Sequence, residues 1–319
     1  AILGHLDFIN AKARWAHDTK ATLPLLSKGN HVSLRKARHP LIDPQRVVTN
    51  DIKIGEDYQA IIITGPNTGG KTITLKTLGI IQLMGQSGLF IPAEEGSTIG
   101  IFDNVFADIG DEQSLEQNLS TFSGHMDGVK AILEQITSRS LVLLDELGAG
   151  TDPKEGAALA MAILDNIGSK GTMVVITTHY PELKVYGYDR AKTINASMEF
   201  DQETLKPTYK LLLGIPGRSN GLEIAQRLGI SPQVIDEART FVSNDSQDLN
   251  NMIGDLVEQR KKAREESEKL AKLVAKNEKV QRDLDEKLTR FNEQRDKLYE
   301  QARSKANHQV SMAKKKADR

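Results

Sequence analysis

A glycine-rich segment, GPNTGGKT at residues 65–72, directly follows the apolar run of residues 60–63. An apolar run that ends in glycine predicts a buried strand, and the apolar positions after residue 72 predict a helix that begins near Lys71. Glycines allow successive backbone N–H groups to turn inward around a phosphate chain, and the helix N-terminus adds its positive dipole end. The sequence therefore predicts an α/β protein with a phosphate-binding loop between a strand and a helix.

The side chains of this loop fit the chemistry of a nucleoside triphosphate. Lys71 is predicted to reach the β- and γ-phosphates, and the hydroxyl of Thr72 is predicted to ligate magnesium. The other residues predicted to surround the nucleotide are Gly65, Pro66, Asn67, Thr68, Gly69 and Gly70. ATP and Mg²⁺ are thus the expected cofactors, and an incidental glycine turn is the alternative.

A second apolar run, residues 141–144, leads directly into Asp145 and Glu146. This pattern predicts a core strand that ends in two carboxylates. A carboxylate beside a phosphate loop can hold magnesium directly or through water, and the next carboxylate can polarise an attacking water. We therefore assign Asp145 to the metal and Glu146 to the general base. The alternative is that both residues only cap the following turn.

A third predicted strand, residues 173–177, is followed by Thr178, His179 and Tyr180. A single histidine in such a place is more often structural than catalytic. The three elements together, however, resemble the ATPase heads of the ABC class of P-loop NTPases. This resemblance implies that His179 contacts the γ-phosphate and acts with Lys71 and Glu146 in hydrolysis.

The segment between these elements distinguishes the branches of that class. Transporters carry LSGGQ there, whereas residues 118–126 read NLSTFSGHM and resemble the S-T-F signature of the MutS family. Three further segments resemble that family: FIPAEE at residues 90–95, LLDELGAGTDPKEGAALA at 143–160 and TTHY at 177–180. These segments are collinear between about residues 36 and 240, so the chain is identified as a member of the MutS family.

The resemblance implies a homodimer with composite ATP sites. Asn67 would occupy the nucleotide-sensing position of the family, and Ser120 and Thr121 would act on the ATP of the partner subunit. Residues 214–242 are similar to a region that packs against the partner's ATPase domain in the family. Packing within a single chain is the alternative for that region.

Two features resemble the second bacterial branch of the MutS family: Thr68 in the phosphate loop and LLLGIPGRSNGLEIAQRLGIS at residues 211–231. Members of that branch are associated with suppression of recombination and with rescue of collided ribosomes. They carry a long coil and a C-terminal Smr nuclease domain. We expect this chain to stop before any Smr domain, so no nuclease activity is expected from these residues.

Both ends of the chain carry heptad-like apolar patterns. Ile2 begins a repeat of four- and three-residue steps, which the resemblance assigns to the family's lever helices. A lattice of the same spacing runs through the C-terminal segment, but polar residues interrupt it, so a helix there would need a partner helix. The predicted domains are the end of the lever helices at residues 1–22, the ATPase domain at 23–245 and a coiled-coil arm at 246–319.

Charge is divided unevenly along the chain, although the formal net charge is −1. Residues 258–319 contain 19 Lys or Arg and 12 Asp or Glu, a surplus of seven positive charges. A basic arm suits contact with the phosphates of DNA or ribosomal RNA. The mixture of both charges along it suits a solvated helix surface equally well. The predicted partners are a second copy of the chain and DNA, the ribosome or both.

No cysteine is present, and no apolar run approaches the roughly 18 residues of a membrane span. Disulfide and thiolate chemistry are therefore excluded, and the sequence predicts a cytoplasmic protein without a membrane partner. The functional hypothesis is an ATP-hydrolysing dimeric clamp that couples nucleotide state to the binding of branched DNA or collided ribosomes. The alternative is an ATP-switched DNA-binding module of a mismatch-repair MutS.

Overall fold

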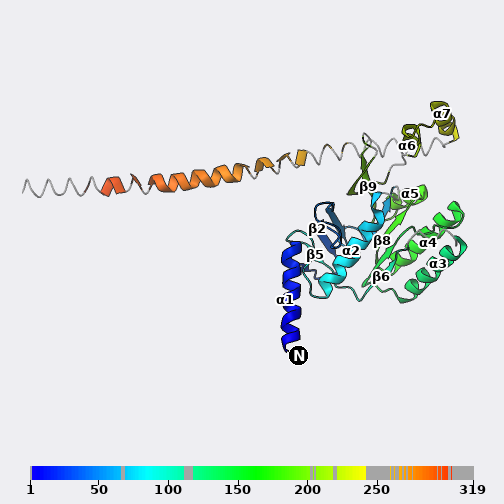
Figure 1. The fold of residues 1–319 in the computed structure, drawn as a ribbon, viewed down its shortest axis with the longest axis horizontal. Helices are drawn as coiled ribbons and strands as arrows, with labels where there is room; N and C mark the ends of the chain where they lie inside the picture. The colour runs from blue at the N-terminus through cyan, green and yellow to red at the C-terminus, as the bar shows by residue number, and fades with distance from the viewer. Residues whose placement is uncertain are drawn as a thin grey trace, which may run out of the picture. The chain divides into compact units, whose positions relative to one another are not determined.

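The computed structural model describes residues 2–65, 69–110, 118–201, 204, 206–217 and 221–241, and an interrupted helix between residues 259 and 303. At residues 118–121 the description covers the backbone alone. Three predicted loop residues, Pro66, Asn67 and Thr68, lie outside the described residues. The chain divides into two compact units, Ala1–Gly254 and Asp255–Arg319 (Figure 1).

A six-stranded sheet forms the centre of the first unit, with the strand order β10-β9-β4-β8-β7-β6. Five strands run parallel, and β10 is antiparallel to β9. The strands are β4 (Ala60–Thr64), β6 (Asn104–Asp108), β7 (Ser140–Leu144), β8 (Met173–Thr178), β9 (Thr193–Asp201) and β10 (Lys206–Leu213). Every residue of β7 and β8 is buried, as expected for a parallel sheet that is covered on both faces. The predicted α/β class is confirmed.

The side chains of each central strand alternate between two apolar cores. Ile61 and Ile63 of β4 belong to one core, and Ile62 belongs to the other. The helix α2 (Lys71–Gln86) packs in the first core, whereas α3 (Asn118–Gln135), α4 (Pro153–Ser169) and α5 (Pro181–Asp189) pack in the second. Figure 1 shows α2 on one side of the central strands and α3 and α4 on the other. This three-layer arrangement leaves the strand ends open for loops.

A second sheet covers the first core. Its strand order is β1-β5-β2-β3, and its inward residues include Leu34 and Ile52, both buried. The strands are β1 (Leu25–Leu26), β2 (Val32–Ala37), β3 (Asn50–Ile54) and β5 (Thr98–Ile99). Val47 and Val48 lie before β3 in an irregular segment, although together with Ile52 and Ile54 they form an apolar pattern that is typical of strands. The alternating apolar pattern of this region therefore extends into a loop that packs elsewhere.

Strands β9 and β10 form an antiparallel hairpin after His179, in which Asp201 pairs with Lys206. Two short helices follow, α6 (Gly221–Arg227) and α7 (Pro232–Phe241). α7 begins at Pro232, where proline is favourable because the first helical N–H needs no partner.

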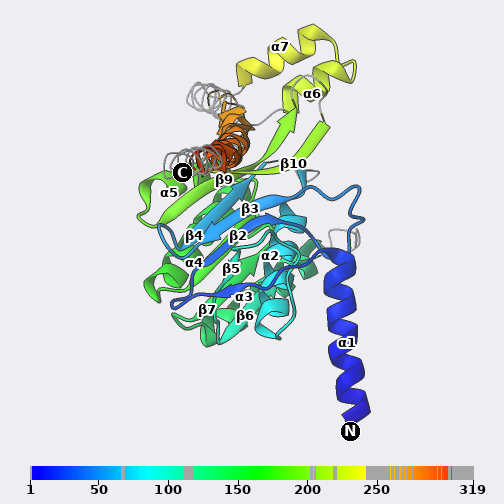
Figure 2. The ribbon, with the colours of Figure 1, turned by 90° about the vertical axis from the view of Figure 1, so that its left-hand side faces the viewer.

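The two sheets and the helices packed on them form the part of the first unit that we call the head. The N-terminal helix α1 (Ile2–Thr19) projects from it, as Figure 2 shows. Its apolar residues Ile2, Leu6 and Ile9 are exposed, and within α1 only Ala16 is buried. Burial of one residue gives a helix little stabilisation from packing. The assignment of residues 1–22 to lever helices stays a prediction, as do the boundaries at residues 23 and 246.

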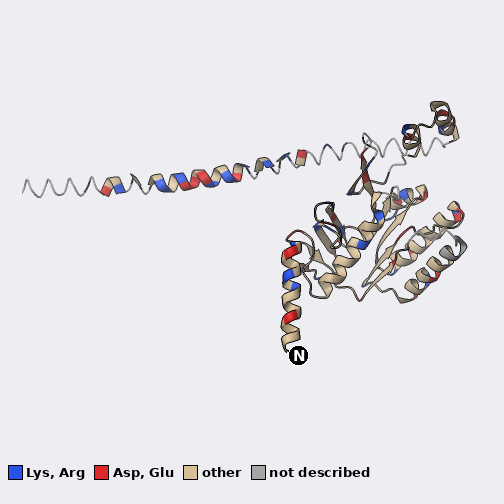
Figure 3. Cartoon of the chain, in the orientation of Figure 1, with Lys and Arg blue, Asp and Glu red and all other residues tan. Residues whose placement is uncertain are grey.

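The second unit is helical in its described part, and all of its described residues are exposed. The exposed apolar residues of the predicted lattice include Leu270, Val274, Leu284, Leu288, Phe291 and Leu298. Basic and acidic residues are interspersed along this helix (Figure 3). The described residues of this unit form one interrupted helix, and much of residues 246–319 lies outside the described residues, so the coiled coil stays a prediction. Among the described residues no helix is both long and apolar enough to cross a membrane.

Candidate functional site

The predicted site residues follow three neighbouring parallel strands, β4, β8 and β7. The carboxyl ends of parallel strands meet at one edge of a sheet, and loops at that edge form binding sites in α/β proteins. Lys71 and Thr72 come after β4, Asp145 and Glu146 after β7, and His179 after β8. The topology therefore brings together groups that lie more than a hundred residues apart in the sequence.

Lys71 is the first residue of α2, and its side chain is only 1% exposed. The ammonium group donates a hydrogen bond to the carbonyl oxygen of Gly65 at 2.7 Å, and it lies 2.9 Å from His179 Nε2. Gly65 and Gly70 have φ angles of 134° and 94°, which side chains disfavour, so both positions require glycine. The described part of the loop thus uses backbone conformations that favour glycine, and its binding of phosphate stays a prediction.

Thr72 and Asp145 form the part of the site that could hold a metal ion. The Thr72 hydroxyl donates to Asp145 Oδ2 at 2.6 Å, and the Thr177 hydroxyl donates to the other carboxylate oxygen of the buried Asp145. A hydroxyl beside a carboxylate suits Mg²⁺, which prefers oxygen ligands. The described residues contain no group of three or more His, Cys, Asp or Glu that could form a metal cage. A magnesium ion here would take its remaining ligands from phosphate and water.

Glu146 follows β7 and His179 follows the adjacent strand β8, and their side chains are in contact. His179 Nε2 is 3.1 Å from Glu146 Oε1, and the backbone N–H of Glu146 donates to Thr177 Oγ1 at 2.8 Å. Glu146 has a φ of 51°, in the left-handed region that non-glycine residues seldom adopt. Backbone strain of this kind is often found where a side chain is aimed at a functional site. The carboxylate can accept a proton, and His179 lies between it and Lys71.

The loop after Glu146 is held closely against α4 and β8. The hydroxyl of Tyr180 donates to the carbonyl oxygen of Gly148 at 2.7 Å. A Cβ atom at Gly156 would lie 2.4 Å from that oxygen and 2.6 Å from the Tyr180 hydroxyl, so only glycine fits there. Burial, followed by the nearby carboxylates of Glu146, Glu182 and Asp152, raises the pKa of Tyr180 and keeps it a hydrogen-bond donor.

Helix α3 carries the predicted signature in its first turn. Ser120 and Thr121 lie there, and their side chains are outside the described residues, so their role stays a prediction. Further along the helix, His125 Nδ1 lies 2.8 Å from Asp108 Oδ2 at the end of β6. The backbone carbonyl of Asp108 accepts from the N–H of Asp145. The His125–Asp108 contact thus connects α3 to β6, and the Asp108–Asp145 bond connects the end of β6 to the residue that follows β7.

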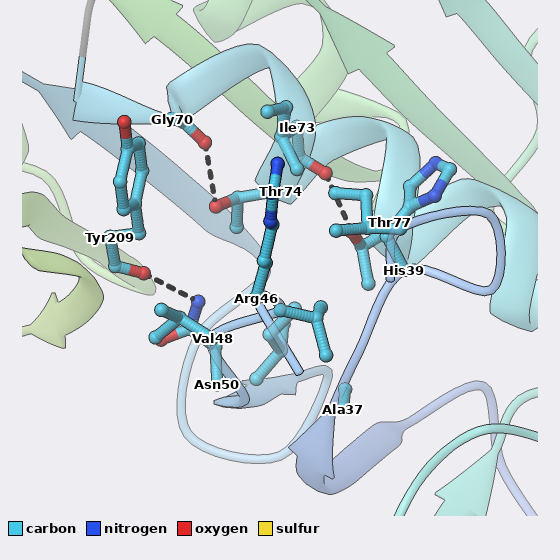
Figure 4. A pocket seen from close by; sticks show the side chains of 13 residues that line it. Ala37, His39, Arg46, Val48, Asn50, Gly70, Ile73, Thr74, Thr77 and Tyr209 are labelled. Carbon is cyan, nitrogen blue, oxygen red and sulfur yellow. Dashed lines mark hydrogen bonds between the residues drawn. The ribbon is translucent and has the colours of Figure 1, made fainter. Parts of the chain in front are cut away.

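A cavity of about 290 Å³ lies beside Gly70, and sequence analysis did not anticipate it. Figure 4 shows Tyr209 and Arg46 bordering it, with Asn50 below them. His39 also lines it, and burial together with the charge of Lys76 lowers the pKa of His39. The lining residues are Ala37, His39, Ile42, Arg46, Val47, Val48, Asn50, Ile52, Gly70, Ile73, Thr74, Thr77 and Tyr209. In the sequence, Val47 and Val48 are a visible apolar pair among these lining residues, but such a pair is typical of a strand and does not indicate a cavity wall.

A phosphate loop, an Asp-Glu strand end and a histidine strand end on adjacent parallel strands define a P-loop ATPase domain. The family described as MutS domain V matches residues 61–244. The chain belongs to the MutS family. The matched residues include the segments after β4, β7 and β8 that form the site, and also the S-T-F, FIPAEE and TTHY segments that predicted this family.

Relatives confirm the branch that the sequence resembles. The chain is 64% identical over its whole length to "Endonuclease MutS2" of Lactiplantibacillus plantarum and covers 40% of that protein. It is 62% identical over its whole length to the protein of the same name from Lacticaseibacillus casei, and covers 41% of it. The Levilactobacillus brevis protein of that name is 63% identical over 96% of this chain, which covers 39% of it. The chain thus spans about 40% of the length of these relatives.

Proposed function

We propose that the chain binds ATP with magnesium and hydrolyses it as one half of a composite, dimeric site. The observation that carries this proposal is a series of side-chain contacts at the carboxyl edge of the sheet. Lys71 Nζ lies 2.9 Å from His179 Nε2, which lies 3.1 Å from Glu146 Oε1. Thr72 and Asp145 lie next to Lys71 and Glu146 in the sequence, and Thr72 Oγ1 is 2.6 Å from Asp145 Oδ2. A cation, a metal-ligating pair and a base are thus within reach of one phosphate group.

In this proposal, the backbone of residues 65–70 surrounds the phosphates and Lys71 neutralises the charge that develops on them. Asn67 and Thr68 are predicted members of this loop and lie outside the described residues. Thr72 and Asp145 would hold magnesium, which would neutralise part of the phosphate charge. Lys71 reaches this position preorganised, because it is buried and held by Gly65 and His179.

Hydrolysis needs a base that is aimed at the terminal phosphate. Glu146 accepts a proton from a water molecule as the water oxygen attacks the γ-phosphorus and the bond to the ADP oxygen breaks. His179 contacts both Glu146 and Lys71, so it holds the base beside the cation and can donate to a phosphate oxygen. The left-handed backbone conformation of Glu146 costs conformational energy, and such strain is common where a side chain is held in position for catalysis.

The cavity beside Gly70 is the place for the base of the nucleotide. Gly70 belongs to both the phosphate loop and the cavity wall, so a nucleotide with its phosphates on the loop extends toward this cavity. The volume of about 290 Å³ is near the lower limit of ligand pockets, about 300 Å³, and suits a base better than a whole nucleotide. The aromatic ring of Tyr209 offers a stacking surface.

The composite site requires a second copy of the chain. Ser120 and Thr121 of one head would close over the γ-phosphate held by its partner, and nucleotide turnover would open and close the pair. The lever helix and the C-terminal arm would convert this motion into clamping or release of nucleic acid or nucleoprotein. Branched DNA and collided ribosomes are the candidate targets. The "endonuclease" in the relatives' name is not assigned to the residues of this chain.

Glu146→Gln tests the proposed chemistry, because glutamine keeps the size of the side chain and loses its basicity. We expect hydrolysis to fall about a hundredfold or more, while ATP binding persists and ATP-bound dimers accumulate in analytical ultracentrifugation. Glu155→Gln in the first turn of α4 is a matched control and is expected to hydrolyse ATP normally. Unchanged turnover in Glu146→Gln would remove Glu146 as the base.

An ATP-switched DNA-binding module of a mismatch-repair type is the second candidate, and it predicts a different coupling. In a clamp, DNA or ribosomes change the hydrolysis rate, and nucleotide changes the affinity for them. In a binding switch, nucleotide changes the affinity while turnover is incidental. Because binding couplings are reciprocal, each affinity must be measured with the other ligand present and absent.

A further inference from the structure

Tyr209 adopts an uncommon backbone conformation beside the cavity. Its φ is 59°, in the left-handed region that bulky residues seldom enter. Its ring lies against the phosphate loop, since a Cβ atom at Gly70 would be 3.0 Å from Tyr209 Cδ1. The residue as a whole is 44% exposed, so part of it is available to a ligand. Some contact must keep the backbone of Tyr209 in this conformation.

A bulge in β10 turns Tyr209 toward the loop. Pro207 pairs with Phe200, and Leu211 pairs with Met198, so β10 has two residues more than β9 across this interval. A bulge disrupts the regular ladder and re-aims a side chain. Tyr209 lies inside this interval. The backbone groups on either side of it therefore need partners from outside the β9–β10 ladder.

Asn50 supplies those partners from the other sheet. Its Nδ2 donates to the carbonyl oxygen of Tyr209 at 2.9 Å, and its Oδ1 accepts from the N–H of Leu211 at 2.8 Å. Figure 4 shows the first of these bonds below the ring of Tyr209. Asn50 is the first residue of β3 and pairs with Ala37, so its own backbone is fixed in the second sheet. One carboxamide thus satisfies a carbonyl and an N–H two residues apart on β10.

We propose that Asn50 is a positioning residue for the base of the bound nucleotide. By binding Tyr209 and Leu211 it fixes the bulge and keeps the ring of Tyr209 against Gly70, at the wall of the cavity. Its carboxamide oxygen and one of its two N–H groups are engaged by β10, so the role assigned to Asn50 is exerted through Tyr209. This inference rests on the proposed function, since it concerns the base of ATP.

The test separates the base from the phosphates. Isothermal titration calorimetry measures the affinity of the whole chain for ATP and for inorganic tripolyphosphate, each with Mg²⁺. We expect Asn50→Ala to weaken ATP binding about tenfold, which equals the loss of about 1.4 kcal/mol, and to leave tripolyphosphate binding within about twofold of the original. A general loss of structure would weaken both ligands alike, which would overturn the proposal.

A double-mutant cycle tests whether Asn50 acts through Tyr209. We expect Tyr209→Ala to weaken ATP binding by a similar factor, and the Asn50→Ala, Tyr209→Ala double variant to bind no more weakly than Tyr209→Ala alone. Additive losses would contradict a positioning role. Lys210→Met is the matched control: it removes the 2.7 Å bond from Lys210 Nζ to the carbonyl of Thr49 in the same pair of segments and is expected to leave ATP binding unchanged.

Asn50→Asp keeps the size of the side chain and the acceptor for Leu211 but loses the donor to Tyr209, so it serves if Asn50→Ala does not fold. We expect it to weaken ATP binding selectively as well. Full ATP affinity in both Asn50 variants would overturn the inference alone and leave the proposed ATPase intact. A wild-type chain that binds neither ATP nor tripolyphosphate would overturn the proposed function and this inference with it.

Discussion

The head of the molecule buries a lysine, whereas the C-terminal helix exposes its leucines. Lys71 is 1% exposed at the sheet edge, and Leu298 in the second unit is 66% exposed. Both observations run against the usual distribution, in which lysine is outside and leucine inside. A buried charge is tolerated where partners surround it, and Gly65 and His179 do so for Lys71. An exposed row of leucines has no such compensation within the described helix.

The difference shows where the sequence carries complete instructions. The groups that satisfy Lys71 come from the same chain, so one copy of the sequence is enough to form that part of the site. The apolar lattice of the second unit repeats at a spacing that suits a partner helix, which one described helix cannot supply. One copy of the sequence is thus sufficient to form the head, whereas the apolar residues of the arm need a partner helix to be buried.

Truncation of a leucine in each unit gives the largest expected contrast. Leu78 in α2 is 1% exposed and Leu284 in the second unit is 52% exposed. Leu78→Ala should lower the free energy of unfolding of the head by about 2–5 kcal/mol, because it leaves a cavity in the core. Leu284→Ala should change it by less than about 0.5 kcal/mol. Urea unfolding followed by circular dichroism measures both, and comparable losses would show that the arm packs like a core.

Replacement of the buried cation tests the other half of the comparison. Lys71→Met keeps the length of the side chain and removes its charge, so we expect ATP affinity to fall about a hundredfold, about 2.7 kcal/mol. The stability without nucleotide should hold or rise, because an apolar side chain replaces a buried charge. Calorimetric titration and thermal unfolding measure the two effects. Lys76→Met, an exposed position on the same helix, is the control, and an equal loss of affinity there would contradict a specific role for Lys71.

Charges placed on the apolar lattice test whether the arm needs a partner. We expect Leu284→Asp with Leu288→Asp to weaken self-association of the chain about tenfold, since like charges would face each other in a paired seam. ATP affinity of the head should not change. Sedimentation velocity over a concentration series measures association, and the exposed polar exchange Lys287→Gln is the control. Unaltered association in the double variant would mean that the lattice does not form the contact between copies.

Much of the site followed from local sequence signals. The runs before Gly65, Asp145 and His179 each predicted a strand, and parallel strands deliver the residues after them to one edge. The cavity did not follow, because its wall combines the segment around Val48 with α2 and with Tyr209. The direction of the Tyr209 side chain depends on a bulge, which alternation along β10 alone does not reveal. Long-range pairing, rather than local preference, decided these positions.

The close approach of Gly148 and Gly156 has a mechanical consequence. The Gly148 carbonyl lies in the space that any side chain at residue 156 would need, and the Tyr180 hydroxyl closes the third side. The start of α4 is therefore in direct backbone contact with the loop that follows Glu146. A displacement of α4 toward this loop would have to move the loop as well, and with it the backbone beside the Glu146 carboxylate.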